Sequence, residues 1–142
     1  MIIAIDFDGT IVEHRYPQIG RELPFAIETL KKLSAERHRL ILWTVREGRL
    51  LDEALEFCRS RGLEFYAVNR DYPEEEQERN NHFSRKLKAD VFIDDRNLGG
   101  LPDWGRIYDM IHNGKTWQDY ISPAPSPWEE DEPQPKKRWW KF

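Results

Sequence analysis

Acidic and hydroxyl side chains follow three short apolar segments of the chain, at the point where each segment ends. They are Asp6 and Asp8 after the first segment, Thr44 after the second, and Asp94 and Asp95 after the third. Four carboxylates gathered at one place repel one another unless a cation lies among them. Oxygen ligands suit a hard divalent cation, and Mg²⁺ is typically held by one or two carboxylates, water and a substrate phosphate. These residue types therefore predict a magnesium site that handles phosphate.

The segment DFDGT, from Asp6 to Thr10, carries two acids two positions apart. Side chains at this spacing share one face of a regular strand, but Gly9 gives the chain the freedom to bend out of the sheet directly after Asp8. The two acids can then approach a phosphate from different directions. An isolated pair of this kind is usually a solvated turn. A buried strand ahead of it, and a second acid pair after a later strand, favour a functional site.

Short runs rich in apolar and β-branched residues predict the strands that must position these side chains, at 2–5, 39–43, 64–68 and 90–93. Apolar residues at helical spacing predict three helices, which begin near Pro24, span 48–61 and span 103–113. Strands that alternate with helices indicate a parallel sheet with right-handed crossovers. In such sheets the active site lies outside the carboxyl ends of the strands, where the acids fall. We therefore expect an α/β, Rossmann-like chain with a three-layer parallel sheet flanked by helices.

The chain has 142 residues, enough for one domain with a core of ordinary size, and we place that domain at 1–121. Its net charge of −4 disfavours a general nucleic-acid-binding protein, which is usually basic. The single cysteine, Cys58, cannot form an intrachain disulfide and fits a buried apolar position. The N-terminal apolar run is too short for a signal peptide or a membrane span, so we expect a cytoplasmic protein with no membrane partner.

Two segments lack the pattern of a buried element. The segment 69–85 is polar and irregular, with room for a short helical turn over its EEEQER stretch, and we expect Glu74, Glu75 and Glu76 to be solvated. In 122–142, a run of prolines accompanies an acidic block and precedes the basic-aromatic end KKRWWKF. Proline opposes both helix and central strand, so we expect a mobile tail. Its three tryptophans leave open the alternative that it docks on the domain, on a second subunit or on the rim of the site.

Over residues 1–113 the chain resembles the haloacid dehalogenase (HAD) superfamily of phosphohydrolases, because four signature segments occur in the family's order. They are DFDGT with Asp6, ILWT with Thr44, RKLKADV with a lysine, and VFIDDRN with Asp94 and Asp95. DFDGT after a buried strand is a specific signal, whereas the threonine and the lysine alone are weak ones. The lysine is either Lys86 or Lys88. Similar family members often carry it at the distance from the acid pair that Lys86 has, which favours Lys86.

The resemblance implies a two-step mechanism. Asp6 attacks phosphorus and forms an aspartyl-phosphate, which is covalent catalysis by a carboxylate. Asp8 protonates the leaving oxygen and then activates the water that cleaves the intermediate, so it must carry a proton in the first step. Thr44 hydrogen-bonds a phosphate oxygen, and the lysine neutralises charge on the nucleophile and the phosphate. Phosphoryl transfer depends mainly on positioning and charge stabilisation, which these groups would supply.

The same resemblance implies how the metal and the substrate are held. Mg²⁺ would be bound by Asp6, Asp94 and the main-chain carbonyl of Asp8, with Asp95 in support directly or through water. The substrate contacts that it implies are Gly9, Thr10, Thr44 and Arg46.

Two basic residues near the acids also have an ordinary interpretation. Arg46 follows Thr44 in TVREG. Family members often have a substrate-contacting arginine near this position, but a solvated arginine at the start of a helix fits equally well. His14 lies in the loop after DFDGT, where a solvated side chain is the favoured interpretation.

Members of this superfamily usually carry a cap domain over the site, inserted after the first signature or between the second and the third. Here the intervals 9–43 and 45–85 are largely filled by the expected helices and strands, so neither holds a real cap. The site is then open, and either a large substrate or a neighbouring subunit would close it. The partner expected is therefore a phosphorylated substrate, with a homo-oligomer as the alternative source of a lid.

The leading hypothesis is a Mg²⁺-dependent phosphatase. A second is a binding or regulatory module of low catalytic power on the same scaffold, which the missing cap favours and the intact acid set disfavours. A third is a phosphatase on nucleic-acid ends, since the basic and aromatic residues of KKRWWKF suit single strands, although the acidic WEEDEP ahead of them weakens this idea. A fourth is a receiver-type phospho-acceptor domain. Such a domain carries its acid pair after the first strand and its acceptor after a middle strand, unlike the order here.

Overall fold

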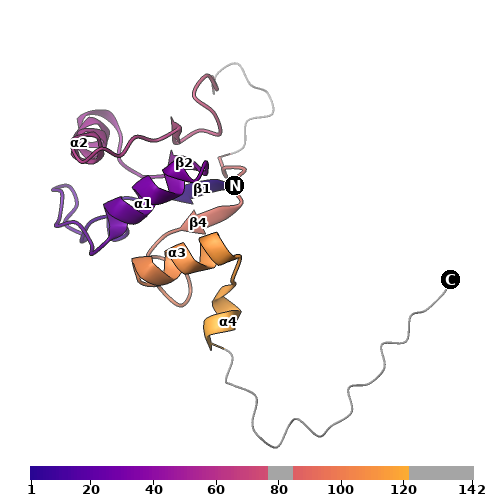
Figure 1. Cartoon of the computed structure of the whole chain (residues 1–142). Coiled ribbons are helices and arrows are strands. Elements are labelled where there is room, and N and C mark those ends of the chain that lie inside the picture. The colour runs from indigo at the N-terminus through magenta and orange to yellow at the C-terminus, as the bar shows by residue number, and fades with distance from the viewer. Residues whose placement is uncertain (77–84, 122–142) are drawn as a thin grey trace, which may run out of the picture.

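The computed structural model describes residues 1–76 and 85–121, except for the side chains of Trp117 and Ile121. The described chain is α/β: a four-stranded, all-parallel sheet has the order β3-β2-β1-β4, and helices flank it (Figure 1). The elements in chain order are β1 (Ile2–Ile5), α1 (Ala26–Ala35), β2 (Arg39–Leu42), α2 (Gly48–Arg59), β3 (Ala67–Val68), β4 (Val91–Ile93), α3 (Trp104–Asn113) and α4 (Trp117–Ile121). This architecture is compatible with the Rossmann-like fold expected. The tail expected at 122–142 and the part of EEEQER beyond Glu76 lie outside the described residues.

Strand β1 lies inside the sheet because it pairs on both sides. Ile5 is in register with Leu42 of β2 and with Ile93 of β4. The pairing continues past the strand ends: the Asp6 N–H donates to the Ile93 carbonyl at 3.0 Å, and the Trp43 N–H donates to the Ile5 carbonyl at 2.8 Å. The residues that follow these three strands therefore leave the sheet at the same edge.

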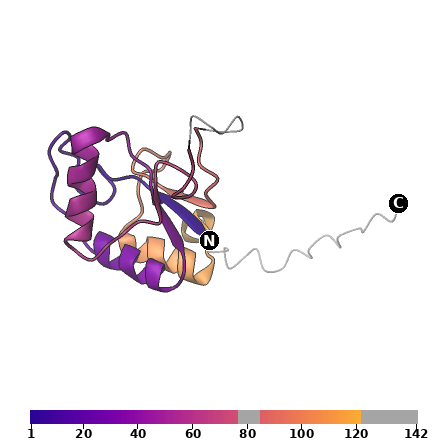
Figure 2. The ribbon, with the colours of Figure 1, turned by 90° about the horizontal axis from the view of Figure 1, so that it is seen from above.

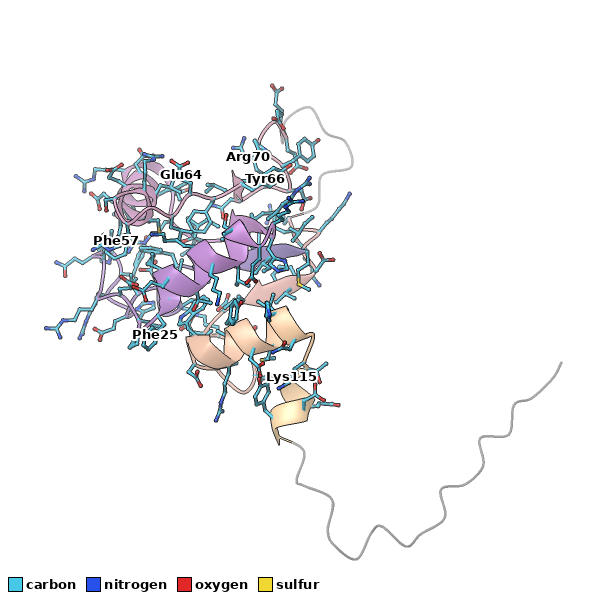
Figure 3. All side chains as sticks on the ribbon, viewed as in Figure 1. Phe25, Phe57, Glu64, Tyr66, Arg70 and Lys115 are labelled. Atoms are coloured by element: carbon cyan, nitrogen blue, oxygen red, sulfur yellow. The ribbon has the colours of Figure 1, made fainter. Side chains whose placement is uncertain are left out.

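The larger part of the core lies on one face of the sheet. The alternation of side chains along β1 directs Ile3 and Ile5 to this face, where they join apolar residues of α1, α2 and α3. Helices α1 and α3 lie side by side along the sheet (Figure 2). Phe57 of α2, labelled in Figure 3, packs edge-on against Phe7, with ring centroids 5.9 Å apart. Burial of this apolar surface is the main favourable contribution to folding.

The opposite face of the sheet carries a smaller apolar cluster. Ala4 and Ile41 pack there with Leu87, which belongs to no helix or strand. Within the described residues this face is thus covered by coil, and the expected three-layer arrangement with helices on both faces is not what the structure has. The cause is local, because the described residues between β3 and β4 form turns and coil, with Pro73 among them, instead of a crossover helix.

Two elements differ from the prediction. Strand β3 is shorter than the expected 64–68, because only Ala67 and Val68 come into register with β2. Helix α4 follows the three expected helices and was not predicted. The Asp119 carboxylate accepts hydrogen bonds from the backbone N–H and the hydroxyl of Thr116, which ties the first turn of this short helix together.

Glu75 was predicted to be solvated, but it is buried and only 4% exposed. Its Oε2 accepts a hydrogen bond from the Asp71 N–H at 2.8 Å, and Arg70 donates to its carbonyl at 3.4 Å. A buried carboxylate is tolerated when hydrogen bonds replace those it loses to water. Glu74 and Glu76 are exposed as expected.

Candidate functional site

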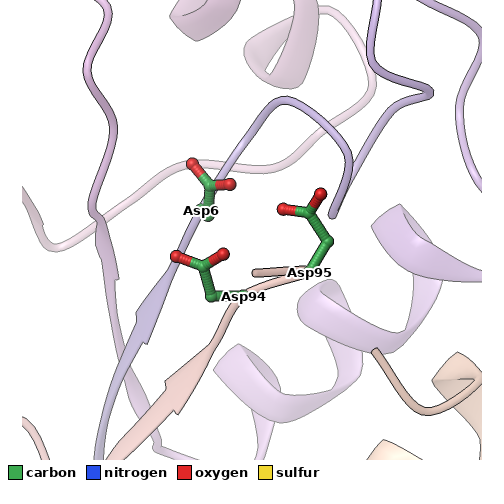
Figure 4. Close-up of side chains that lie close together, drawn as sticks. All are labelled: Asp6, Asp94 and Asp95. Atoms are coloured by element: carbon green, nitrogen blue, oxygen red, sulfur yellow. The ribbon is translucent and has the colours of Figure 1, made fainter. Parts of the chain in front are cut away.

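Three carboxylates converge where β1 and β4 end. Asp6 directly follows β1, and Asp94 and Asp95 directly follow β4, so the register of the two strands brings them together. One oxygen of each lies within 4.8 Å of the others. Figure 4 shows the three carboxyl groups around one shared space. The acids thus meet at the edge of the sheet where the order of the strands predicts them.

The close approach of these acids has an electrostatic cost. Burial, with a further contribution from the charges of Asp94 and Asp95, raises the pKa of Asp6 from 3.8 to about 7. A backbone hydrogen bond from Phe7 opposes this rise without cancelling it. A bound cation would lower the cost, because it favours the ionised form of each acid.

The oxygen donors at this edge fit Mg²⁺. Octahedral Mg²⁺ holds its ligands at ~2.1 Å, so opposite oxygens lie about 4.2 Å apart. Oxygens that already lie within 4.8 Å of one another need only small side-chain adjustments to reach this geometry. A donor set made of carboxylates alone favours a hard cation over zinc, which prefers nitrogen and sulfur. Asp6, Asp94 and Asp95 would be the ligands, and the Asp8 carboxylate is not part of the group.

Thr10 supports the acids from inside the protein. Its side chain is fully buried, and its hydroxyl accepts a hydrogen bond from the Asp95 N–H at 3.1 Å. The same hydroxyl lies 3.3 Å from Asp95 Oδ1 and 3.5 Å from Asp6 Oδ2, to either of which it can donate. Trp104 fixes the segment by donating its Nε1–H to the Thr10 carbonyl at 3.1 Å. Thr10, expected to contact substrate, therefore positions two acids here, and sequence reasoning missed Trp104.

Gly9 allows Asp95 to approach the first signature closely. Its φ of +82° lies in the left-handed region that favours glycine. A Cβ at this position would lie 2.3 Å from Asp95 Oδ2, far inside van der Waals contact. Gly9 thus has a positioning role in addition to the substrate contact that the resemblance implies.

The Asp8 carboxylate is held by Arg46. Arg46 is 1% exposed, and its Nε and Nη2 donate to Asp8 Oδ2 and Oδ1, both at 2.7 Å. Its other donors reach the carbonyls of Pro17, Gln18 and Leu50. All five N–H groups of the guanidinium are therefore in use. The solvated interpretation of Arg46 is wrong, and in this state none of its donors is left for a substrate.

Thr44 is the second residue after β2, and a hydrogen bond holds its backbone in place. Its N–H donates to Asn69 Oδ1 at 2.8 Å, and its hydroxyl accepts from the Arg46 N–H at 3.1 Å. The hydroxyl keeps its own hydrogen to donate to another group. Sequence reasoning missed Asn69, although Asn69 follows β3 as Thr44 follows β2, and the same rule could have located it.

Four of the residues described above line a cleft of about 490 Å³. Its acidic and hydroxyl lining consists of Asp6, Asp8, Thr44 and Asp94, and the remaining lining consists of His14, Tyr16, Trp43, Val45 and Arg96. His14 is exposed, as expected, but it belongs to the cleft. The aromatic residues, Val45 and Arg96 were not singled out from the sequence, because no local pattern marks them.

Neither candidate lysine lines this cleft. Lys86 is exposed, and its Nζ lies 5.8 Å from the centroid of the Phe92 ring. Lys88 is exposed as well, and its backbone N–H donates to Asp71 Oδ1 at 2.7 Å. The assignment of Lys86 stays a prediction, and it requires the lysine side chain to turn toward the acids when a phosphate binds.

Comparison with known proteins places the chain beside one solved structure. No protein-family model and no curated protein matches the chain. No helix in the described part of the chain is long and apolar enough to span a bilayer. The fold is similar to that of a conserved protein from Bacteroides thetaiotaomicron, with a TM-score of 0.80 and 71% sequence identity over 87% of this chain and 98% of the other. The chain therefore belongs to the same family as this conserved Bacteroides protein.

Proposed function

We propose that this protein is a Mg²⁺-dependent phosphohydrolase of the HAD type that acts through an aspartyl-phosphate on Asp6. The observation that carries the proposal is the convergence of Asp6, Asp94 and Asp95 at the carboxyl edge of a parallel sheet, where Asp6 and Asp94 line a cleft together with Thr44. The order of the four signature segments along the chain supports the same conclusion.

The reaction consists of two displacements at phosphorus. An oxygen of Asp6 attacks phosphorus while the bond to the leaving oxygen breaks, and the leaving oxygen takes up a proton. Water then attacks the aspartyl-phosphate, which releases phosphate and restores the Asp6 carboxylate. The Thr44 hydroxyl donates to a phosphate oxygen and keeps phosphorus in line with the nucleophile. Asp6, Asp94 and Asp95 would hold Mg²⁺, which when bound would neutralise charge on the phosphate.

Asp8 is the proton donor and acceptor in this proposal. It lines the cleft together with Asp6, and each of its oxygens accepts one hydrogen bond from Arg46. A carboxylate offers about four lone-pair sites, so the Arg46 fork leaves the others for a leaving-group proton or a water molecule. Arg46 then holds Asp8 in place while Asp8 acts.

The decisive experiment is a turnover assay on a panel of phosphate monoesters. We expect the wild type to release phosphate in excess Mg²⁺ and to stop after chelation, and Asp6→Asn to release none. Asp52→Asn is the matched control, because Asp52 is an exposed acid of α2 outside the cleft. Wild-type turnover in a well-folded Asp6→Asn variant would refute the proposal.

A second candidate is a binding module of low catalytic power on the same scaffold. One observation favours it: both oxygens of Asp8 are engaged by a buried arginine, which restrains the group that must exchange protons. The same assay separates the two candidates. Mg²⁺-dependent binding of phosphate without turnover of any ester would favour the binding module.

A further inference from the structure

The cleft that contains Asp6 is lined by two chemically different sets of side chains. Besides its acids and Thr44, the cleft is lined by two aromatic rings, a valine and two basic side chains. Its volume of about 490 Å³ lies in the range of small-molecule sites. The acids and Thr44 account for a phosphate and its metal, so the other side chains are left to contact whatever the phosphate is attached to.

Tyr16 packs in this cleft against a side chain that is itself held by hydrogen bonds. Its ring lies over the Arg46 guanidinium, with 5.3 Å between the ring centroid and the central carbon. That guanidinium is held in place, because all five of its N–H groups are hydrogen-bonded, and the centroid of the Phe7 ring lies 5.2 Å from its central carbon. Even so, Tyr16 remains 45% exposed. A partly exposed aromatic ring that packs on a hydrogen-bonded side chain suits stacking against a flat ring.

Val45 and Trp43 extend the apolar lining of the cleft. Val45 is 84% exposed, although its neighbours Thr44 and Arg46 are both held by hydrogen bonds. Single exposed apolar residues need no explanation, but this valine shares one cleft with two aromatic rings. Trp43 is half-buried, because part of it packs on the smaller apolar cluster on the opposite face of the sheet.

Two basic side chains complete the lining. His14 and Arg96 are exposed, and neither forms an ion pair within the described residues. They can attract a phosphorylated ligand and solvate a polar edge of its ring. The cleft thus presents basic side chains, aromatic rings and apolar surface around a phosphate site.

We propose that this cleft selects phosphate monoesters whose leaving group carries a flat aromatic ring, and that the ring stacks on Tyr16. The inference rests on the proposed function. An aryl or arylalkyl phosphate and a nucleoside monophosphate share the chemistry that is recognised, which is a flat ring within a few bonds of a phosphate.

The test compares two non-hydrolysable ligands with six-membered carbon rings, benzylphosphonate with a flat aromatic ring and cyclohexylmethylphosphonate with a puckered saturated one. Calorimetric titration in excess Mg²⁺ measures the binding of each. We expect benzylphosphonate to bind about tenfold more tightly, a factor that corresponds to about 1.4 kcal/mol. Turnover of benzyl phosphate, cyclohexylmethyl phosphate and a nucleoside 5′-monophosphate then distinguishes a simple ring from a nucleoside.

Variants of Tyr16 distinguish the contribution of its ring to binding from that of its hydroxyl. Tyr16→Leu should reduce the tenfold ratio to about one, and Tyr16→Phe should preserve it. Tyr72→Leu is the matched control, because Tyr72 is 44% exposed and lies outside the cleft lining, so the ratio should stay at its wild-type value.

The two proposals fail in different ways. A ratio of about one in the wild type, or a ratio that survives in a folded Tyr16→Leu variant, would overturn the ring site even if phosphate esters are hydrolysed. A ratio of about ten with no Asp6-dependent turnover would overturn the proposed function and, with it, the assignment of the ring as a leaving group. The ring proposal is supported when the ratio, its loss in Tyr16→Leu and Asp6-dependent turnover occur together.

Discussion

Arg46 and Asp8, which are 38 residues apart in the chain, form a buried two-pronged ion pair with both nitrogen–oxygen distances at 2.7 Å. The same guanidinium donates to the carbonyls of Pro17, Gln18 and Leu50. One side chain therefore joins the first signature, the following loop and the start of α2. The position of Asp8 in the cleft depends on this arginine.

Replacement of Arg46 should strongly destabilise the protein. Arg46→Met leaves the Asp8 charge buried without a partner, and loss of one member of a buried pair typically costs about 3–5 kcal/mol. Chemical denaturation monitored by circular dichroism measures the change in the free energy of unfolding. Arg46→Lys should recover only part of the loss, because an ammonium cannot reproduce the planar fork.

The control for Arg46→Met is Arg49→Met. Arg49 is 86% exposed and forms an ion pair with Glu53 at 3.5 Å on the surface of α2. Exposed pairs contribute about 0–1 kcal/mol, so this variant should unfold almost as the wild type does. Equal destabilisation by the two substitutions would show that the Arg46 pair contributes no more to the free energy of unfolding than an exposed ion pair does.

Gly9→Ala should destabilise the fold and disturb the acid group. Gly100→Ala is the control that separates backbone strain from the clash with Asp95. Both glycines have positive φ, +82° and +77°, so alanine at either costs about 1–2 kcal/mol of backbone strain. Only at Gly9 does the added Cβ meet another group, Asp95 Oδ2 at 2.3 Å. Overpacking of this kind adds about 1–3 kcal/mol. Thermal denaturation of the two variants measures the difference, and equal losses would contradict the contact between Gly9 and Asp95.

Asp6→Asn should abolish turnover without loss of stability. The amide is nearly isosteric with the carboxylate and can still accept a hydrogen bond from Thr10, but it is a poor nucleophile. The substitution also removes one charge from a site where burial and two neighbouring acids raise the pKa of Asp6 to about 7. The melting temperature should therefore equal or exceed that of the wild type without metal. A marked fall in melting temperature would show that the Asp6 charge stabilises the fold.

Mg²⁺ should raise the melting temperature of the wild type, because a ligand that binds only the folded state stabilises it. The gain is about 2.7 kcal/mol when the ligand concentration is a hundred times the dissociation constant. Asp94→Ala should remove this shift and Asp95→Ala should reduce it less, since Asp95 is already engaged by Thr10. Asp52→Ala, which alters an exposed acid of α2, should leave the shift unchanged. A reversed order for the two ligand variants would refute this ranking.

Cys58 should be unreactive in the folded protein. It is fully buried, and burial raises the pKa of its thiol from 9.0 to about 12. A thiol-specific chromogenic reagent at pH 8 should label it only after denaturation. Between pH 9 and about 12 the unfolded chain loses this proton and the folded chain keeps it, so stability should fall as pH rises through this window. Cys58→Ala should show a shallower fall, and an unchanged slope would contradict the assignment.

The prediction of the site from the sequence worked where one rule sufficed. Runs of apolar residues located β1, β2 and β4, and the residues just beyond them were placed at one edge because parallel strands end together. That rule brings Asp6, Asp94 and Asp95 into one group without any knowledge of side-chain packing. It would also have found Asn69, which follows β3 and holds the backbone of Thr44.

Strand β3 and Glu75 mark where sequence reasoning was insufficient. The pattern at 64–68 predicts a strand, but how many of its residues pair depends on where the chain leaves α2, and only Ala67 and Val68 reach the register of β2. Glu75 belongs to a run of three acids, which indicates a solvated segment. The turn after Arg70 nevertheless folds its carboxylate inward to the Asp71 N–H.

The sequence by itself therefore determined which chemistry-bearing residues leave the sheet at one edge, because that depends only on strand order and direction. Only the tertiary structure decided which contacts and hydrogen bonds those residues form. The five hydrogen bonds of Arg46 reach four residues in three separate segments, and the close approach of Gly9 and Asp95 joins two distant parts of the chain. A guanidinium is buried only when every one of its donors finds an acceptor, and that condition can be met only after the whole chain has packed.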